Sequence, residues 1–204
     1  MVVTNPPFSL FREFVAQLEE YHKKFIIWGN NNAITYKEIF PLIKDGKMWL
    51  GYRVNKTCYF KLSPDYPKWD EKFTAKMHDG SHYGKVPAIS TFTNIDTQKR
   101  HHKLETVYRW RKRKEKYPDL YPKYDNYDAI EVGKVLQIPL DYDGLMTVPI
   151  TFLDKYNPEQ FELVGEANHG SDGPWDLFKP LLHGKYKFKR LLIKNKHPED
   201  YQNN

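Results

Sequence analysis

Apolar positions in residues 1–62 fall into short continuous runs, separated by stretches in which they recur at helical spacing. The runs predict strands, the spacing predicts helices, and Gly29 with the asparagines after it predicts a turn. Continuous apolar runs are typical of strands in a sheet that is covered on both faces. We therefore expect an α/β sheet with helices on both faces, built from strands at 1–4, 24–28, 47–54 and 57–62 and helices at about 9–21 and 35–44.

The pattern changes after Ser63, where prolines, glycines and polar residues dominate. A strand is predicted at 88–95 and a loop at 117–127, because the latter is rich in Tyr, Pro, Asp and Asn. Further short extended stretches are predicted within 130–138 and at 148–153, 161–164 and 187–193. The second half of the chain is therefore expected to be rich in loops.

Composition excludes several classes of protein. The chain has 204 residues, of which 40% are hydrophobic and 28% charged, so disorder of the whole chain is excluded. Cys58 is the single cysteine, so neither an internal disulfide nor a cysteine metal cluster can form. The sequence has no apolar run long enough to span a bilayer and no leader pattern at its start. We expect a cytoplasmic protein without membrane contact.

The positive charge is concentrated in one segment, residues 99–116, which has a net charge of +7 against +6 for the whole chain. Tyr108, Trp110 and Tyr117 interleave with its basic residues, and such a mixture suits contact with nucleic acid. The alternative is a solvated charge run. The basic residues are Lys99, Arg100, Lys103, Arg109, Arg111, Lys112, Arg113, Lys114 and Lys116.

Acidic and histidine side chains give weaker signals. Asp125, Asp128, Asp141 and Asp143 could form a metal cluster in a nuclease, but acidic residues in Pro/Tyr loops are more often turn formers. His169, His183 and His197 have no metal-ligand spacing, and we expect no metal site.

The string Asn5-Pro6-Pro7-Phe8 directly follows the first predicted strand. Two prolines make a rigid turn, so the Asn5 side chain and the Pro6 carbonyl can both accept hydrogens from one exocyclic amino group. Phe8 can stack on the planar base that carries the group, and such positioning favours methyl transfer to the amino nitrogen. The alternative is an ordinary turn before a helix.

The string and its surroundings resemble the EcoRI-type adenine-specific DNA methyltransferases. The similar blocks follow the family's order along nearly the whole chain: 2–30, 32–50, 93–96, 121–130, 138–163 and 192–196. The resemblance implies a partial Rossmann-like class I methyltransferase sheet with a loop-rich target-recognition region. It also implies site-specific transfer of a methyl group from S-adenosylmethionine to adenine-N6 in duplex DNA, in a bacterial or phage-encoded restriction-modification or DNA-modification system.

The resemblance assigns roles to residues. Asn5 and Pro6 would accept from the amino group of a flipped adenine, on which Phe8 stacks, and Pro7 would hold the turn. Double-stranded DNA would contact the basic segment, and Lys123, Asn126 and Arg109 are chemically suited to reading base edges. For each of these three residues the alternative is a phosphate contact or plain solvent exposure.

The chain also departs from the family, because it has no glycine-rich strand-to-helix loop of the kind that cradles the cofactor. The resemblance implies that residues 1–63 and about 86–97 form the catalytic half of a methyltransferase-like domain. Residues 98–204, with the basic segment 99–116, form its DNA-recognition region. We expect either a homodimer or a separate cofactor-binding chain as partner. The alternative is a catalytically inactive DNA-binding derivative of the family, acting as a regulator or an inhibitor.

Overall fold

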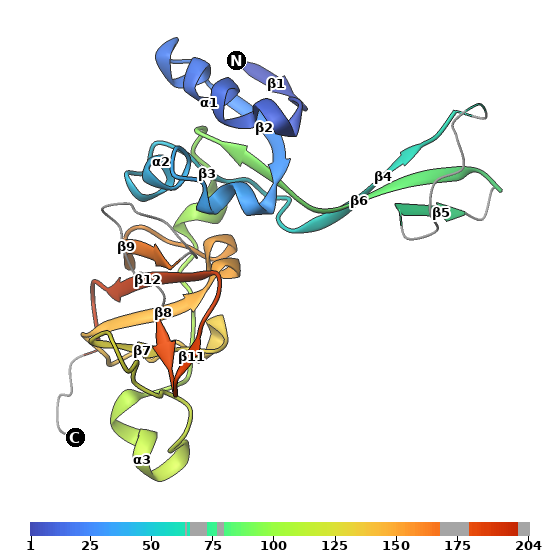
Figure 1. The fold of residues 1–204 in the computed structure, drawn as a ribbon. Helices are drawn as coiled ribbons and strands as arrows, with labels where there is room; N and C mark the ends of the chain where they lie inside the picture. The colour runs from blue at the N-terminus through green and yellow to red at the C-terminus, as the bar shows by residue number, and fades with distance from the viewer. Residues whose placement is uncertain (64, 66–72, 77–79, 168–179, 200–204) are drawn as a thin grey trace. The chain divides into compact units, whose positions relative to one another are not determined.

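The computed structural model describes residues 1–63, 65, 73–76, 80–167 and 180–199. The chain divides into two compact units, and Figure 1 labels their elements. Unit 1 comprises residues 1–33 and 50–95, and unit 2 comprises residues 34–49 and 96–204. Each unit is described by itself.

Unit 1 is built on a mixed sheet with the strand order β1-β2-β6-β3, and β4 and β5 also pair with β6. β1 and β2 are parallel, whereas β2, β4 and β5 run antiparallel to β6. The strands are β1 (Val2–Thr4), β2 (Phe25–Asn30), β3 (Trp49–Leu50), β4 (Lys56–Lys61), β5 (Thr74–Lys76) and β6 (His82–Thr93).

The helix α1 (Phe11–Glu20) covers one face of this sheet. Side chains alternate along β2, so Phe25, Ile27 and Gly29 are buried on the side of α1. The Phe11 ring contacts the Phe92 ring edge-on, with centroids 5.1 Å apart. Gly29 lies under both rings, where only a residue without a side chain fits. The close approach of helix and sheet therefore depends on this glycine.

Most predicted elements of unit 1 are confirmed, with three corrections. Gly29 and Asn30 are not in a turn, because they pair with Ser90 and Ile89 as the end of β2. The strand predicted at 47–54 is only the two residues of β3. Helices on both faces are not seen, since α1 is the single α-helix among the described residues of this unit.

The helix predicted at 35–44 forms only over α2 (Phe40–Lys44), and it belongs to unit 2. Pro41 lies in its first turn. Proline has no N–H and its ring collides with the preceding turn, so a helix can begin at this position but cannot run through it. The mixed α/β class is confirmed, with fewer helices than the pattern predicted.

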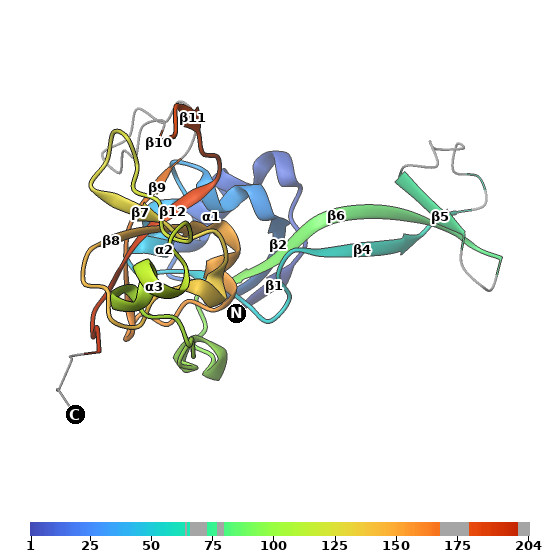
Figure 2. The same cartoon turned by 90° about the horizontal axis from the view of Figure 1, so that it is seen from below.

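Unit 2 contains a four-stranded mixed sheet with the order β7-β8-β12-β9 and a separate small hairpin, β10–β11. β7 is parallel to β8, and β12 is antiparallel to both β8 and β9. Figure 2 shows the elements from below. They are α3 (Arg113–Lys116), β7 (Ala129–Glu131), β8 (Leu145–Pro149), β9 (Phe161–Ala167), β10 (Leu181–Leu182), β11 (Lys185–Tyr186) and β12 (Arg190–Asn195).

A buried ionic network ties three strands of unit 2 to the loop at 117–127. The Glu131 carboxylate accepts hydrogen bonds from Arg190, from Thr147 Oγ1 at 2.7 Å and from the Tyr124 hydroxyl. Burial alone would raise the pKa of Glu131, but the Arg190 guanidinium and the two hydroxyl donors together lower it. The carboxylate therefore stays charged in the core, which a buried charge does only when it is fully paired.

The late elements agree with the sequence pattern in position, if not in length. The stretch predicted at 148–153 is the end of β8 followed by a 3-10 helix over Ile150–Asp154. The strands predicted at 161–164 and 187–193 are β9 and β12, and residues 117–127 form a loop as predicted. The functional division of the chain into a catalytic half and a recognition region stays a prediction.

Replacing Gly29 with alanine tests the close approach of α1 to the sheet. The new Cβ would lie 2.6 Å from Phe11 Cε2 and 2.9 Å from Phe92 Cε2, so both rings would have to move. We expect Gly29→Ala to lower the free energy of unfolding by about 1–3 kcal/mol, measured by urea denaturation. Gly133→Ala is the control, because the nearest atom to its Cβ would be 3.9 Å away. Equal stability of the two variants would contradict the packing described.

Candidate functional site

The string Asn5-Pro6-Pro7-Phe8 lies at the carboxyl end of β1, where the strand leaves the sheet. Pro6 has no N–H, so it cannot continue the hydrogen-bond ladder with β2. The Leu10 N–H donates to the Pro7 carbonyl at 3.0 Å and starts a 3-10 turn over Phe8–Leu10 that leads into α1. Ser9 lies within this turn, and the N-cap position of α1 is occupied by Leu10.

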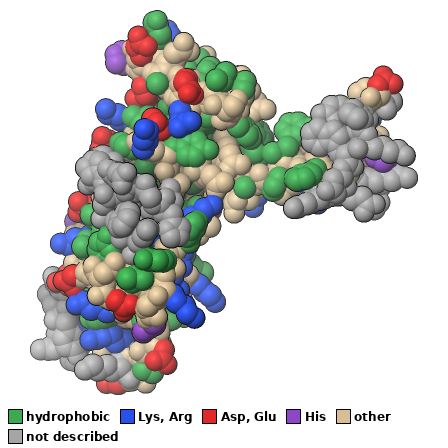
Figure 3. Space-filling model, in the orientation of Figure 1, with side chains coloured by type: hydrophobic (Ala, Val, Ile, Leu, Met, Phe, Trp, Pro, Cys, Tyr) green, Lys and Arg blue, Asp and Glu red, His purple; other side chains and the backbone are tan. Residues whose placement is uncertain are grey.

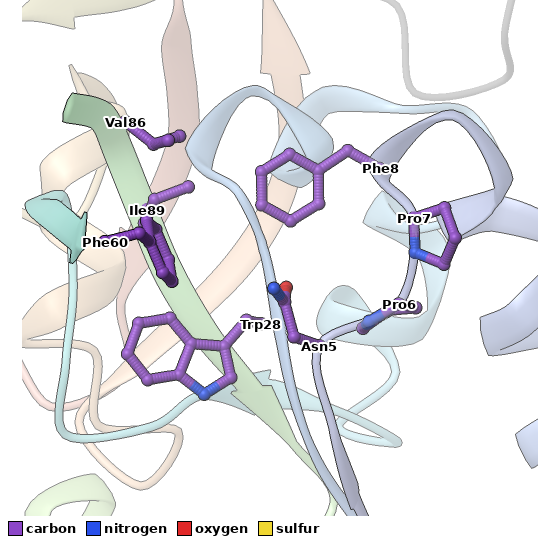
Figure 4. A pocket seen from close by; sticks show the side chains of 8 residues that line it. All are labelled: Asn5, Pro6, Pro7, Phe8, Trp28, Phe60, Val86 and Ile89. Carbon is purple, nitrogen blue, oxygen red and sulfur yellow. The ribbon is translucent and has the colours of Figure 1, made fainter. Parts of the chain in front are cut away.

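The string borders a cavity of about 320 Å³ within unit 1. Figure 4 shows the Asn5 amide and the Phe8 and Trp28 rings around this hollow. The lining comes from the turn after β1 and from three strands, β2, β4 and β6. The lining residues are Asn5, Pro6, Pro7, Phe8, Trp28, Phe60, Val86 and Ile89.

The polar groups of the string are available for a ligand. Asn5 is exposed, Pro6 is buried and Phe8 is half-buried. Within the described part of the chain, no hydrogen bond is found to the Asn5 side chain or to the Pro6 carbonyl oxygen. Two oxygen acceptors in an otherwise apolar cavity suit a planar ligand that carries an amino group.

Two aromatic residues of the cavity, Trp28 and Phe60, were not predicted from the sequence. The parallel register pairs Thr4 with Ile27, so the next positions, Asn5 and Trp28, point to the same face of the sheet. This face is the one opposite α1. The Arg53 guanidinium lies 5.3 Å from the centre of the Trp28 ring and adds positive charge beside the cavity. Trp28 could have been predicted only from the pairing of β1 with β2. Phe60 is 52 positions from Phe8 in the chain, so no local pattern connects the two rings.

The basic segment 99–116 has internal partners for several of its charges. The acidic groups that hold its basic residues come from distant positions: Asp154 for Lys99, Glu199 for Arg109 and Asp141 for Arg111. The Arg113 guanidinium stacks 3.7 Å from the centre of the Trp110 ring, and Arg100 stacks 4.0 Å from that of Trp49. These residues therefore stabilise unit 2 whether or not they also contact DNA.

Other predicted DNA-contacting residues differ in their surroundings. Lys103 and Lys112 are exposed, and none of the ion pairs among the described residues involves them. Lys123 pairs with Asp128 at 2.7 Å, and Asn126 Oδ1 accepts from the Leu181 N–H at 2.8 Å. The side chain of Lys114 lies outside the described part of the chain. The DNA-contacting role of all these residues stays a prediction.

No cluster of His, Cys, Asp or Glu that could hold a metal ion is found among the described residues. Asp125 accepts from the Gly184 N–H at 2.8 Å, and Asp141 accepts from the Trp110 N–H at 2.5 Å. Both carboxylates therefore accept from backbone N–H groups of segments far away in the chain. His183 has a positive φ of 51° and is exposed, His197 is exposed, and His169 lies outside the described residues.

One ionic cluster joins the start of the basic segment to the turn before β9. His101 Nε2 lies 2.9 Å from Asp96 Oδ2, and His101 Nδ1 lies 3.0 Å from Glu159 Oε1. Both ring nitrogens face carboxylates, so the protonated imidazolium satisfies both contacts. Hydrogen bonds to Asp96 first and to Glu159 second raise the pKa of His101 above its ordinary value of 6.5.

The turn after β1 and the aromatic cavity, with Asn5 and Pro6 in its lining, form a site whose chemistry suits a planar ligand with an amino group. Residues 1–202 match the family described as "Adenine-specific methyltransferase EcoRI", and the chain belongs to this family. The resemblance drawn from the sequence is confirmed.

Relatives with known names come from three bacteria. The chain is 44% identical over 199 residues to the type II methyltransferase M.EcoRI of Escherichia coli, covering 96% of this chain and 57% of that protein. It is 45% identical over 167 residues to M.MpnI of Mycoplasma pneumoniae, covering 80% and 50%. It is 44% identical over 168 residues to M.MgeORF184P of Mycoplasma genitalium, covering 80% and 51%.

The chain therefore spans about half the length of the curated relatives it matches. No solved structure matches it. Among the described residues, every helix is too short or too polar to cross a bilayer.

The His101 cluster gives a pH dependence with a definite sign. The pKa of His101 is raised in the folded state. The contribution of this cluster to stability is therefore fully present below the ordinary value of 6.5, and it is lost as pH rises through the folded-state pKa of His101. We expect NMR titration of the His101 ring to give a pKa above 6.5. The double variant Asp96→Asn/Glu159→Gln should return it toward the ordinary value. An unchanged His101 pKa in this variant would show that the two carboxylates do not act on the ring.

Proposed function

We propose that this chain carries the target-base site of a site-specific adenine-N6 DNA methyltransferase of the restriction-modification type. The observation that carries the proposal is the cavity at the end of β1. There, the Asn5 side chain lies beside a volume of about 320 Å³ with aromatic walls, and Pro6 is part of the lining. The family membership of the chain supports the choice of adenine as the base.

The site residues act by positioning. Asn5 Oδ1 and the Pro6 carbonyl oxygen each accept one hydrogen of the adenine amino group, which turns the nitrogen lone pair toward the methyl donor. Phe8 stacks on the flipped base, and Trp28 and Phe60 form the remaining aromatic walls of the cavity. The rigid turn holds both acceptors in place before the base arrives, so little ordering is required during the reaction.

S-adenosylmethionine is the methyl donor that we propose, and its chemistry is transfer of a methyl group from a positively charged sulfur. The described residues do not fit this cofactor. Gly29 is covered by Phe11 and Phe92, Gly51 faces Thr91, and no glycine of unit 1 lies in a loop between a strand and a helix. We propose that the cofactor site is completed by another chain, either a separate cofactor-binding chain or a second copy of this chain in a homodimer.

Double-stranded DNA is the partner of the site, and the basic segment 99–116 is its proposed contact in unit 2. Lys103 and Lys112 are the best candidates, because they are exposed and the acidic partners found in unit 2 belong to other residues. Arg109, Lys123 and Asn126 remain candidates for base reading if DNA competes for their internal contacts.

The absence of a glycine-rich loop favours one alternative function. A chain without a cofactor site could be a DNA-binding derivative of the family that acts as a regulator or an inhibitor. Such a protein needs affinity for duplex DNA but has no need of a cavity that holds a single base. The two functions therefore differ in whether the cavity contributes to binding.

The base-holding role predicts a preference for a loosened target. Flipping a paired adenine costs a few kcal/mol, and a mismatch removes part of this cost. We expect duplexes with mismatched adenine to bind about tenfold more tightly than fully paired duplexes, which corresponds to about 1.4 kcal/mol. Fluorescence anisotropy on labelled duplexes measures this ratio.

Phe8→Ala and Phe60→Ala should abolish the preference while leaving affinity for the paired duplex nearly unchanged. Tyr52→Ala is the matched control, because Tyr52 is 70% exposed and does not line the cavity. A preference that survives in Phe8→Ala, or that is absent from the parent chain, would contradict a base-holding cavity.

Calorimetry with S-adenosylmethionine tests the fit of the cofactor. Because the described residues form no cradle for it, we expect no measurable binding by the chain alone, with or without duplex DNA. Binding of DNA should be retained in the same samples. Micromolar binding of the cofactor would contradict this expectation, and would mean that the chain builds a cofactor pocket alone or as a dimer.

A further inference from the structure

A long β-ribbon extends from the sheet of unit 1 (Figures 1 and 2). It is formed by β4 and the first half of β6, and β5 adds a third strand near its far end. The register between the two strands shifts where Lys56 pairs with Ile89 and Cys58 pairs with Val86. Ala88 has a positive φ of 57° at this bulge, which bends the ribbon relative to the rest of β6.

The two faces of the ribbon carry different residues. On one face, Cys58 lies opposite Val86 and Phe60 opposite Gly84, and this face reaches the cavity through Phe60 and Val86. On the other face, Tyr59 lies opposite Lys85 and Lys61 opposite Tyr83. Directly opposed residues in adjacent strands point to the same side. The second face is therefore a checkerboard of two tyrosines and two lysines, called here the Lys–Tyr face.

The Lys–Tyr face is open to solvent. Tyr59 is 47% exposed, Lys61 is exposed, and Tyr83 and Lys85 are half-buried. Figure 3 shows hydrophobic side chains gathered along the ribbon. Aromatic rings on a thin ribbon bury little surface when the chain folds, so they contribute little to its stability. Exposed apolar patches of this kind mark surfaces that bind a partner.

The charge of the ribbon favours a polyanion as this partner. The strands β4 and β6 contain Lys56, Lys61 and Lys85 and no aspartate or glutamate. None of the ion pairs among the described residues involves Lys61 or Lys85. The acidic residues of 56–87 all lie between the strands, at positions 65, 70, 71 and 79.

We propose that the Lys–Tyr face of the ribbon binds the DNA duplex beside the target base. Lys61 and Lys85 neutralise phosphates, while Tyr59 and Tyr83 pack against the sugar and base edges of a groove. The opposite face of the same ribbon lines the base cavity, so duplex and target base lie on the two sides of one thin ribbon. The inference rests on the proposed function, because it takes DNA as the ligand of the cavity.

Salt-dependent binding of a fluorescein-labelled 30-base-pair duplex of mixed sequence tests the proposal. Each lysine that neutralises a phosphate adds about 0.9 to the slope of log affinity against log salt concentration. We expect Lys61→Ala/Lys85→Ala to reduce this slope by about 2, and Lys61→Arg/Lys85→Arg to retain it. Tyr59→Ala/Tyr83→Ala should weaken binding several-fold without changing the slope.

The matched control is Lys23→Ala/Lys24→Ala, which removes the same charge from the same unit, in the connection between α1 and β2. Its slope should equal that of the parent chain within error. All these side chains are exposed except Lys85 and Tyr83, which are half-buried, so the unfolding temperature should be unchanged. Thermal unfolding measured in parallel will identify any variant that fails to fold.

The outcomes separate the ribbon from the proposed function. If the parent chain binds no duplex, the proposed function fails and the ribbon proposal fails with it. If the parent binds but the ribbon double variant has the same slope as the control, only the ribbon proposal is overturned. If the ribbon variants change the molar mass in light scattering and not the DNA affinity, the face is a protein contact and the proposal is also overturned.

Discussion

The pairing of β6 with its neighbours is the constraint on which unit 1 depends. β2, β3, β4 and β5 all hydrogen-bond to β6, and β1 is held in turn by β2. One strand of 12 residues therefore sets three environments along its length. Phe92 packs under α1, Ile89 lines the cavity, and Tyr83 and Lys85 stand on the ribbon. The buried Ser90 hydroxyl secures the middle of the strand, donating to Asn31 Oδ1 at 2.8 Å and accepting from the Asn55 N–H.

The base cavity is a consequence of this sheet and not of the Asn-Pro-Pro-Phe string alone. The string supplies two acceptors and one ring, whereas the opposite walls come from β2, β4 and β6. Phe60 connects the cavity with the ribbon, because its neighbours Tyr59 and Lys61 point to the other face. A change of register at the Ala88 bulge would move the Phe60 ring out of the cavity and turn Lys61 toward it. The proposed base holding and the proposed duplex contact therefore depend on the same strand register.

Many charged residues of unit 2 have partners within the unit. The run of basic residues has the composition of a DNA-contacting patch, yet Asp154, Asp141 and Glu199 hold three of its charges in place. The Glu131 network and the His101 cluster fix neighbouring loops by the same means. Ion pairs near the surface stabilise little by themselves. Their effect here is to orient a segment whose regular structure consists of short helical turns, including α3 (Arg113–Lys116).

The sequence by itself determined the family, the Asn5–Phe8 turn, α1 and the approximate position of most strands, because these depend on local patterns and on residues close together in the chain. It did not predict that Gly29 belongs to a strand, that Trp28 and Phe60 face Asn5, or that several arginines are held by distant carboxylates. These depend on strand order, register and a bulge, which are decided by packing between residues far apart in the chain. Side chains alternate with a period of two, so a shift of one residue would have placed every one of them on the other face.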